Sequence, residues 1–252
     1  MATVQKTSPL AKNFEVVSAA EAIKWINALF YGDPGAGKTY LGGTAEDHPD
    51  TSPMLVIDIE GGTLTLRNRP NIDVVSVRSE KEIVKIHNEL HASNNGYYKT
   101  VMLDSLTELQ KLDMRGIMLE LVGRRPDLDP DVPSQREWGK SAEHVRRIVR
   151  AFRDLPMNTI MTALATEFRE ESGATRYFPS LPGKLRSEIP GFMDIVGYLY
   201  TKQDKDNTVR TLQVTGSRRV VAKDRTSALG GVIENPTIPG MWEMIHQERE
   251  ND

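Results

Sequence analysis

Cysteine is absent from the 252 residues of this sequence. Its absence excludes a disulfide framework, thiolate nucleophiles, cysteine-based zinc sites and iron–sulfur clusters. Any chemistry must therefore use oxygen and nitrogen groups, or a metal ion held by oxygen ligands. A chain without cysteine is also compatible with a reducing cytoplasm, and we expect the protein to be cytoplasmic.

Long hydrophobic runs are absent as well. A membrane span needs roughly 18 consecutive apolar residues, whereas the longest apolar runs here, such as 195–200, have the length of a strand and are interrupted, in this case by Gly197. The first 25 residues contain lysines and no uninterrupted hydrophobic block, so a secretory signal is not expected. We therefore expect a soluble protein with no membrane partner.

A large net charge is the third missing feature. The 32 lysines and arginines nearly balance the 35 acidic residues, which gives a formal net charge of -3. This balance argues against a protein whose whole surface attracts nucleic acid. It leaves open a basic stripe on one part of the surface.

Short apolar runs alternate with helical patterns along most of the chain. We expect strands at 25–31, 54–59, 73–77, 100–103 and 159–164, and helices at 79–92, 106–122 and 134–152. Because most of these strands are apolar on both faces, they favour an α/β fold with a mostly parallel central sheet flanked by helices.

The pattern changes after Gly191. Closely spaced runs at 195–202, 209–214 and 218–223 leave no room for crossover helices, and we expect them to form an antiparallel C-terminal extension of the sheet. The predicted organisation is an N-terminal extension at 1–24, which is a candidate subunit contact, then a core at 25–240 and an acidic, peripheral tail at 241–252.

The segment after the first expected strand matches the P-loop pattern G-x-x-x-x-G-K-[ST] in full. Its predicted nucleotide-binding residues are Gly32, Asp33, Pro34, Gly35, Ala36, Gly37, Lys38 and Thr39. In such a loop the glycines let backbone N–H groups surround the phosphates, and the N-terminus of the following helix favours negative charge. We expect Lys38 to reach the terminal phosphates and the Thr39 hydroxyl to ligate Mg²⁺.

Two acidic residues at strand ends can complete this site. Asp104 follows the apolar run 100–103 and is the predicted acid that holds Mg²⁺ through water. Glu60 follows the run 54–59, and its period-2 spacing from Asp58 places both carboxylates on one side of a strand. A carboxylate at this strand end can act as the general base for the water that attacks the γ-phosphate, which favours a hydrolase over a kinase.

These motifs, in this order, resemble those of the RecA-like recombination ATPases, and in particular the small phage-type RecA-core proteins of single-strand annealing and recombination. The resemblance covers residues 25–228 and includes Ile-Asp-Ile-Glu at 57–60 and Leu-Asp-Ser at 103–105. It implies a RecA-like P-loop NTPase fold, ATP and Mg²⁺ as cofactors, and self-assembly into a ring or helical filament. The AAA+ ATPases normally place the catalytic glutamate directly after the Walker B aspartate, where this chain has Ser105.

The resemblance also implies a pair of cations that reach the nucleotide of the neighbouring subunit. The segment 220–225 looks like the one that carries them. Lys223 and Arg225 are therefore predicted to stabilise transition-state charge in trans, and join Lys38 and Glu60 as catalytic residues. The Asn–Gln pair that the family places after the next strand is not found near 165–167.

Single-stranded DNA is the partner that the resemblance implies, and the chain carries local basic segments that fit it. One leads into the helix expected at 134–152; the other is the segment 168–190, which we expect to be a long irregular loop. The candidate DNA-binding residues are Arg124, Arg125, Arg136, Trp138, Lys140, Arg169, Arg176, Tyr177, Phe178, Lys184 and Arg186. Phosphate contacts from the cations and stacking by the aromatic rings would give sequence-tolerant, salt-sensitive binding.

The leading hypothesis is an ATP-dependent, oligomeric single-stranded DNA-binding protein that hydrolyses ATP with Mg²⁺ at subunit interfaces and promotes recombination or single-strand annealing. It would act in the host cytoplasm if phage-encoded, and a single-stranded DNA-binding protein is a further candidate partner. Two alternatives remain open: a nucleotide-switched DNA-binding or assembly module with little turnover, and a helicase-loader or motor-type P-loop ATPase. A small-molecule kinase fits least well because Glu60 suits the activation of water.

Overall fold

A computed structural model of the chain describes residues 9–13, 16, 25–93, 96–169, 173, 175–204 and 207–251. Most of the expected N-terminal extension at 1–24 lies outside these residues. Its described part contains η1 (Pro9–Lys12), a short 3-10 helix. The suggested role of the extension in subunit contact therefore stays a prediction.

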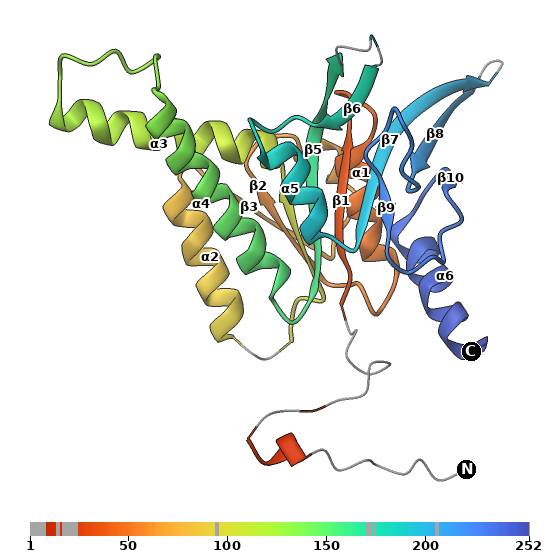
Figure 1. The fold of residues 1–252 in the computed structure, drawn as a ribbon. Coiled ribbons are helices and arrows are strands. Elements are labelled where there is room, and N and C mark those ends of the chain that lie inside the picture. The colour runs from red at the N-terminus through yellow and green to blue at the C-terminus, as the bar shows by residue number, and fades with distance from the viewer. Residues whose placement is uncertain are drawn as a thin grey trace.

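A single twisted sheet runs through the centre of the molecule (Figure 1). Its order among the described residues is β10-β8-β7-β1-β5-β4-β2-β3, with β6 added to β5 and β9 to β7. The strands are β1 (Asn27–Gly32), β2 (Met54–Asp58), β3 (Ile72–Ser76), β4 (Thr100–Asp104), β5 (Asn158–Arg169), β6 (Thr175–Pro179), β7 (Ile195–Asp204), β8 (Asn207–Gln213), β9 (Lys223–Asp224) and β10 (Val232–Glu234).

Pairing within the sheet divides it into a parallel part and an antiparallel part. The strands from β3 to β7 in the sheet order are parallel to their neighbours, whereas β8, β10, β9 and β6 pair antiparallel. The expected fold class, a mostly parallel sheet flanked by helices with an antiparallel C-terminal extension, is confirmed.

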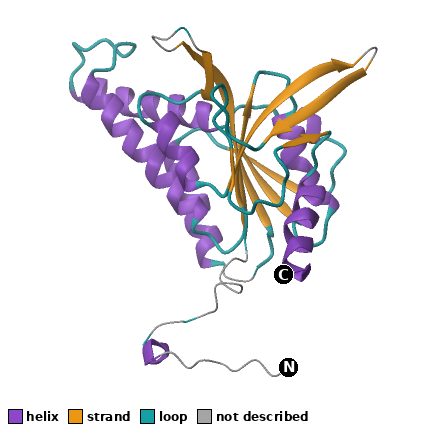
Figure 2. Cartoon of the chain, turned by 45° about the vertical axis from the view of Figure 1, so that its right-hand side comes forward, coloured by secondary structure: helices purple, strands orange, loops and turns teal. Residues whose placement is uncertain are grey.

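Helices cover both faces of this sheet (Figure 2). They are α1 (Lys38–Gly43), α2 (Glu80–Ala92), α3 (Leu106–Arg124), α4 (Gln135–Arg153), α5 (Leu185–Phe192) and α6 (Ile238–Asn251), with 3-10 turns η2 (Thr44–Asp47) and η3 (Thr63–Leu66). No helix in the described part of the chain is long and apolar enough to cross a membrane.

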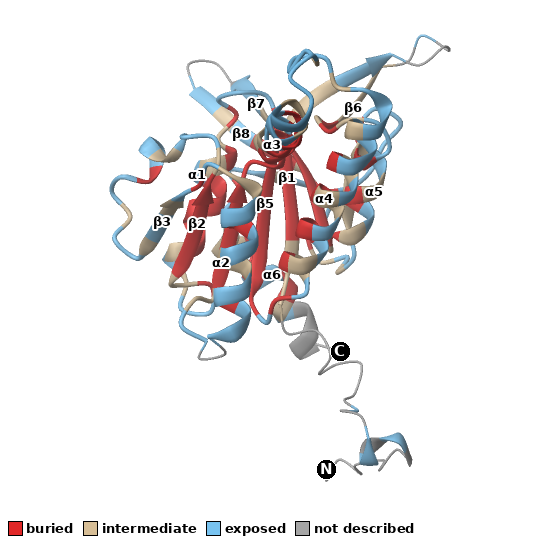
Figure 3. Cartoon of the chain, turned by 90° about the vertical axis from the view of Figure 1, so that its left-hand side faces the viewer, coloured by how far each residue is buried: buried red, intermediate tan, exposed pale blue. Residues whose placement is uncertain are grey.

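Alternation along β1 explains why two layers of helices are needed. Leu29 and Tyr31 point into a core shared with α2, α3, α4 and α5, whereas Ala28 and Phe30 point into a second core shared with α1 and α6. Figure 3 shows the central strands buried throughout. Because helices cover both faces of the sheet, we expect a ligand to bind at the carboxyl ends of its strands.

The segment 168–190 is not the long irregular loop that we expected. β5 continues to Arg169 and pairs antiparallel with β6, and α5 follows from Leu185. The resulting hairpin projects beyond the sheet, as does the hairpin of β7 and β8 (Figure 2). Polar residues in the second half of β5 hid this extension, because a strand that leaves the core no longer needs apolar side chains.

The C-terminal region also differs from expectation. The run 218–223 contributes only β9 and an isolated bridge at Val220, and the sheet instead ends with β10. The segment after 241 is not peripheral, since α6 buries Met241, Trp242 and Ile245 against the sheet. Their spacing on one helical face outweighs the acidic composition of the segment.

Candidate functional site

The P-loop joins the carboxyl end of β1 to α1 at the centre of the sheet, between β5 and β7. Gly32 passes so close to β7 that an added methyl group would lie 2.1 Å from the carbonyl oxygen of Leu199. Gly37 has a φ of 98°, a left-handed conformation that favours glycine. The loop therefore takes a backbone path that side chains would block.

Lys38 lies buried inside this loop. Its ammonium group donates hydrogen bonds to the carbonyl oxygens of Gly32 at 3.0 Å and Asp33 at 2.9 Å. Burial lowers the pKa of Lys38 below its usual value, and the carboxylates of Glu60, Asp104 and Asp33 oppose that shift. A buried cation held by backbone carbonyls and surrounded by carboxylates is ready to exchange these contacts for phosphate oxygens.

Asp104 is the centre of the site. It ends β4, is only 2% exposed, and accepts a hydrogen bond from the Thr39 hydroxyl at 2.6 Å. Its second carboxylate oxygen accepts a hydrogen bond from the hydroxyl of Thr162. The structure thus brings the two expected magnesium-site residues, Thr39 and Asp104, together from strands that are not adjacent.

Thr162 was not among the predicted site residues. It lies on β5, the strand that separates β1 from β4, and is fully buried. The sequence does show a polar residue, Thr162, in the middle of the apolar run 159–164, where burial alone would favour an apolar side chain. A threonine there is also a common strand residue, so only the sheet order identifies its partner.

Glu60 lies beside this centre, although not as part of a strand. β2 ends at Asp58, and the backbone N–H groups of Ile59 and Glu60 both donate to the Asp104 carbonyl oxygen, at 2.8 and 3.2 Å. The expectation that Asp58 and Glu60 share one side of a strand is therefore wrong. Asp58 instead closes the turn by accepting a hydrogen bond from the Gly61 N–H at 2.7 Å, which leaves Glu60 exposed.

The donor set suits a magnesium nucleotide. Mg²⁺ keeps several waters and needs few protein oxygens, which matches one hydroxyl, one carboxylate and the phosphates. Groups of three or more histidine or acidic side chains that could hold a metal ion without a nucleotide do not occur among the described residues. Thr39 and Asp104 are therefore the residues that would hold the ion, Asp104 through water.

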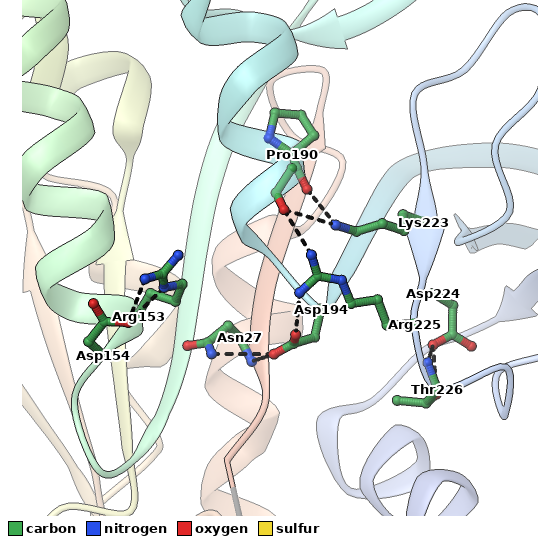
Figure 4. A network of polar contacts seen from close by, with 10 residues as sticks. Asn27, Arg153, Asp154, Pro190, Asp194, Lys223, Asp224, Arg225 and Thr226 are labelled. Atoms are coloured by element: carbon green, nitrogen blue, oxygen red, sulfur yellow. Dashed lines mark hydrogen bonds and ion pairs between the residues drawn. The ribbon is translucent and has the colours of Figure 1, made fainter. Parts of the chain in front are cut away.

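Lys223 and Arg225 lie near the amino ends of β1 and β7, whereas the P-loop follows the carboxyl end of β1. Figure 4 shows their contacts. Arg225 pairs with Asp194 at 3.1 Å, and the same carboxyl group accepts the backbone N–H of Asn27 at the start of β1. Lys223 donates to the Pro190 carbonyl at 2.8 Å, and burial lowers its pKa. The length of β1, roughly 16 Å, separates the amino end of that strand from the P-loop at its carboxyl end. The structure does not bring either cation to the nucleotide site of its own chain.

The first candidate DNA surface is the elbow between α3 and α4, which projects from the molecule (Figure 1). Arg124, Arg125, Arg136 and Lys140 line a cleft of about 610 Å³ there. Glu120 lies among them and pairs with Arg124 at 2.8 Å and with Lys140 at 3.7 Å. Trp138 is 42% exposed but does not line this cleft; it lines a separate pocket with Met118, Pro130 and Pro133. The predicted cations therefore lie together at this elbow, but Glu120 neutralises part of their positive charge.

The second candidate surface is the hairpin of β5 and β6 with the first turn of α5. Arg186 lies over the rings of Phe168 at 4.6 Å and Phe178 at 5.8 Å, and Arg176 lies over Phe178 at 5.1 Å. These side chains form the hairpin cluster, defined by Phe168, Arg176, Phe178 and Arg186. Arginines stacked on phenylalanines present both charge and ring faces.

The remaining candidates on this hairpin lie outside the hairpin cluster. Arg169, at the end of β5, and Lys184, before α5, are exposed and make no stacking contact within the described residues. Tyr177 points to the other face, where its ring stacks on Tyr198 at 5.2 Å. A hydrogen bond to Glu167 raises the pKa of Tyr177. Tyr177 therefore belongs to the base of the two hairpins.

Comparison with known proteins identifies a family and finds similar solved structures. A family profile described as an AAA domain matches residues 24–226. A KaiC-like protein from the hyperthermophilic archaeon Pyrococcus horikoshii OT3 is 15% identical, with a TM-score of 0.47 over 84% of this chain and 89% of that chain. The flagellar accessory protein FlaH from Methanocaldococcus jannaschii is 9% identical, with a TM-score of 0.43 over 79% of each chain. No curated protein sequence matches.

The Thr162 hydroxyl provides a direct test of how Asp104 is held. Thr162→Val keeps the shape of the side chain but leaves a buried carboxylate oxygen without its donor, which costs about 1–3 kcal/mol. We expect the free energy of unfolding in urea to fall by that amount, while Thr162→Ser, which keeps the hydroxyl, stays closer to the wild type. A valine variant as stable as the wild type would show that this hydrogen bond does not hold Asp104.

Proposed function

Because the chain belongs to the family of AAA domains, which are P-loop ATPases, we propose that it hydrolyses ATP at interfaces between its own copies, binds single-stranded DNA and promotes recombination or annealing. One fold hosts many functions, so the site must carry the proposal. The observation that carries its ATPase part is the arrangement around Asp104, which the Thr39 hydroxyl and the Glu60 backbone both contact.

Each side chain of the site has a separate task in hydrolysis. A bound magnesium nucleotide supplies the phosphoryl group and the cation that neutralises its developing charge. Thr39 and Asp104 offer the oxygen ligands, and Lys38 transfers its hydrogen bonds from the loop carbonyls to phosphate oxygens. The Glu60 carboxylate takes a proton from the attacking water, whose oxygen forms the new bond to phosphorus as the bond to the leaving phosphate breaks.

Hydrolysis with and without single-stranded DNA tests this assignment. We expect Mg²⁺-dependent phosphate release that increases when single-stranded DNA is added. Lys38→Ala should lose nucleotide binding, whereas Glu60→Gln should keep binding and lose roughly 10²- to 10⁴-fold in rate, the usual contribution of a general base. Glu89→Gln changes an exposed acid on α2 and is the matched control.

Two results would contradict parts of this proposal. A Glu60→Gln rate equal to that of the wild type would remove Glu60 from the chemistry. A hydrolysis rate that does not change with DNA would count against DNA as the partner, while leaving the ATPase assignment intact.

Lys223 and Arg225 support hydrolysis between subunits rather than within one. They lie near the amino ends of β1 and β7, too far from the P-loop to reach the nucleotide of their own chain, and Arg225 is exposed. A cation that enters a neighbour's site at the moment of reaction stabilises charge on the transferred phosphoryl group. We therefore assign both to the site of an adjacent copy.

Mixing two inactive variants separates action in trans from a structural role. Arg225→Ala should keep nucleotide binding and lose hydrolysis, and mixing it with Glu60→Gln should restore activity, because mixed interfaces combine an intact Glu60 with an intact Arg225. Arg153→Ala, which removes a cation paired with Asp154, is the control. Failure of the mixture to recover any rate, with both variants folded by thermal unfolding, would overturn the trans assignment.

The hairpin cluster supports binding of single-stranded DNA. Its rings are partly accessible, with Phe168 43% exposed, and its arginines lie on those rings rather than only in ion pairs. Stacking on aromatic faces tolerates any base, and arginine adds phosphate contacts. Both properties match a sequence-independent DNA-binding surface.

Substitutions on the hairpin test this surface. We expect Phe178→Ala to weaken binding of an oligothymidylate by about 1–3 kcal/mol, and Arg186→Ala to reduce the slope of log affinity against log salt by roughly 0.7. Lys85→Ala, which removes an exposed cation on α2, should change neither. If Arg124→Ala weakens binding and the hairpin variants do not, the DNA lies on the elbow instead.

A further inference from the structure

Arg210 lies directly over the P-loop, although it comes from β8, two strands away from β1 in the sheet. A methyl group placed on Gly37 would lie 2.6 Å from the Nε atom of Arg210 and 3.1 Å from its Cδ atom. The guanidinium carbon lies 4.9 Å from the centre of the Tyr40 ring, in the first turn of α1. The side chain therefore reaches from β8 to the last glycine of the loop.

The position of Arg210 on β8 determines the direction of its side chain. Arg210 and Leu212 point to the same face of β8, because side chains alternate along a strand. Leu212 is buried in the core that contains Leu41 of α1, so Arg210 points to the face that α1 covers. Antiparallel pairing with β7 and a hydrogen bond from the Asn235 N–H to the Arg210 carbonyl oxygen, at 2.7 Å, fix the strand at this position.

The charge of Arg210 has no acidic partner among the described residues. Arg69 provides the contrast, because it also lies near the Tyr40 ring, at 5.6 Å, but pairs with Asp47 at 2.9 Å and Glu46 at 3.6 Å. Those acids raise the pKa of Arg69 against the effect of its burial. Within the described residues, acids therefore neutralise the guanidinium group of Arg69, whereas the charge of Arg210 is available for a ligand.

A guanidinium group beside a P-loop, with no acidic partner in the described part of the chain, is suited to binding an anion. The glycine at 37 leaves the space that the arginine occupies, and the ring of Tyr40 holds the guanidinium there through a cation–π contact. Guanidinium groups form short, charge-assisted hydrogen bonds with phosphate oxygens. The ligand class that meets an arginine at this loop is a polyphosphate.

We propose that Arg210 is a phosphate-contacting residue of the nucleotide site, supplied by β8 of the same chain and positioned by Tyr40. This inference rests on the proposed nucleotide-dependent function and adds to it a cation that acts without assembly. It differs from the role assigned to Lys223 and Arg225, since Arg210 is already at the loop of its own chain. Its effect on binding should therefore not depend on protein concentration.

Equilibrium binding without DNA tests the proposal. Mg²⁺ complexes of ATP, ADP and inorganic triphosphate are titrated into wild-type protein and into Arg210→Ala, Arg210→Gln and Arg210→Lys. We expect the alanine and glutamine variants to bind all three roughly 10- to 100-fold more weakly, the usual range for losing a hydrogen bond to a charged group, and lysine to recover part of the loss. Lys202→Ala is the matched control, because it removes an exposed cation from the same hairpin that also lies over a tyrosine ring, that of Tyr200.

Four results would overturn the proposal. Unchanged or tighter binding by Arg210→Ala, with Lys38→Ala binding lost, would show that Arg210 is a bystander or covers the loop. An equal loss of affinity in Lys202→Ala would indicate a long-range electrostatic effect of the hairpin's positive charge. A loss of affinity for ATP but not for triphosphate would place the contact on the nucleoside. Wild-type protein that binds none of the three would defeat the proposed function itself. Thermal unfolding of each variant verifies that it is folded.

Discussion

The buried carboxylate of Asp104 is the point on which the whole site depends. Its side chain accepts hydrogen bonds from Thr39, after β1, and Thr162, on β5, while its backbone carbonyl accepts those of Ile59 and Glu60, after β2. One residue thereby joins β4 to β5 and to the segments that follow β1 and β2. A buried charge without such donors would be strongly unfavourable, so the same contacts that stabilise the fold also hold Thr39 and the backbone of Glu60 beside Asp104.

Local motifs explain which parts of the site could be predicted from the sequence. The P-loop, Asp104 and Glu60 each follow an apolar run in the sequence, so they could be chosen as candidates from local sequence, although the spacing of Asp58 and Glu60 misplaced Glu60 on a strand. Thr162 and Arg210 could not be found in this way. Each reaches the site through the order and register of the sheet, and neither has a neighbour in the sequence that marks it.

The same distinction explains the errors in the fold. The parallel core was predicted well because its central strands, such as β1, β2 and β4, are buried on both faces and carry mostly apolar side chains. The extension of β5 beyond the core and the helix α6 were missed for one reason: both have mixed composition, and burial of only one face is enough for each. In α6 that face consists of Met241, Trp242 and Ile245, with Glu243 between them and the charged run 248–250 after them in the sequence.

The length of β5 divides one strand into two regions with different tolerance of insertions and deletions. Up to 164 it lies between β1 and β4, and a shift of one residue would turn Thr162 to the opposite face and remove it from Asp104. Beyond that point it pairs only with β6, where an added or lost residue changes the hairpin alone. An insertion or deletion in the first half of this strand would therefore disturb the Asp104 site, whereas one in the second half would disturb the hairpin cluster and leave the Asp104 site intact.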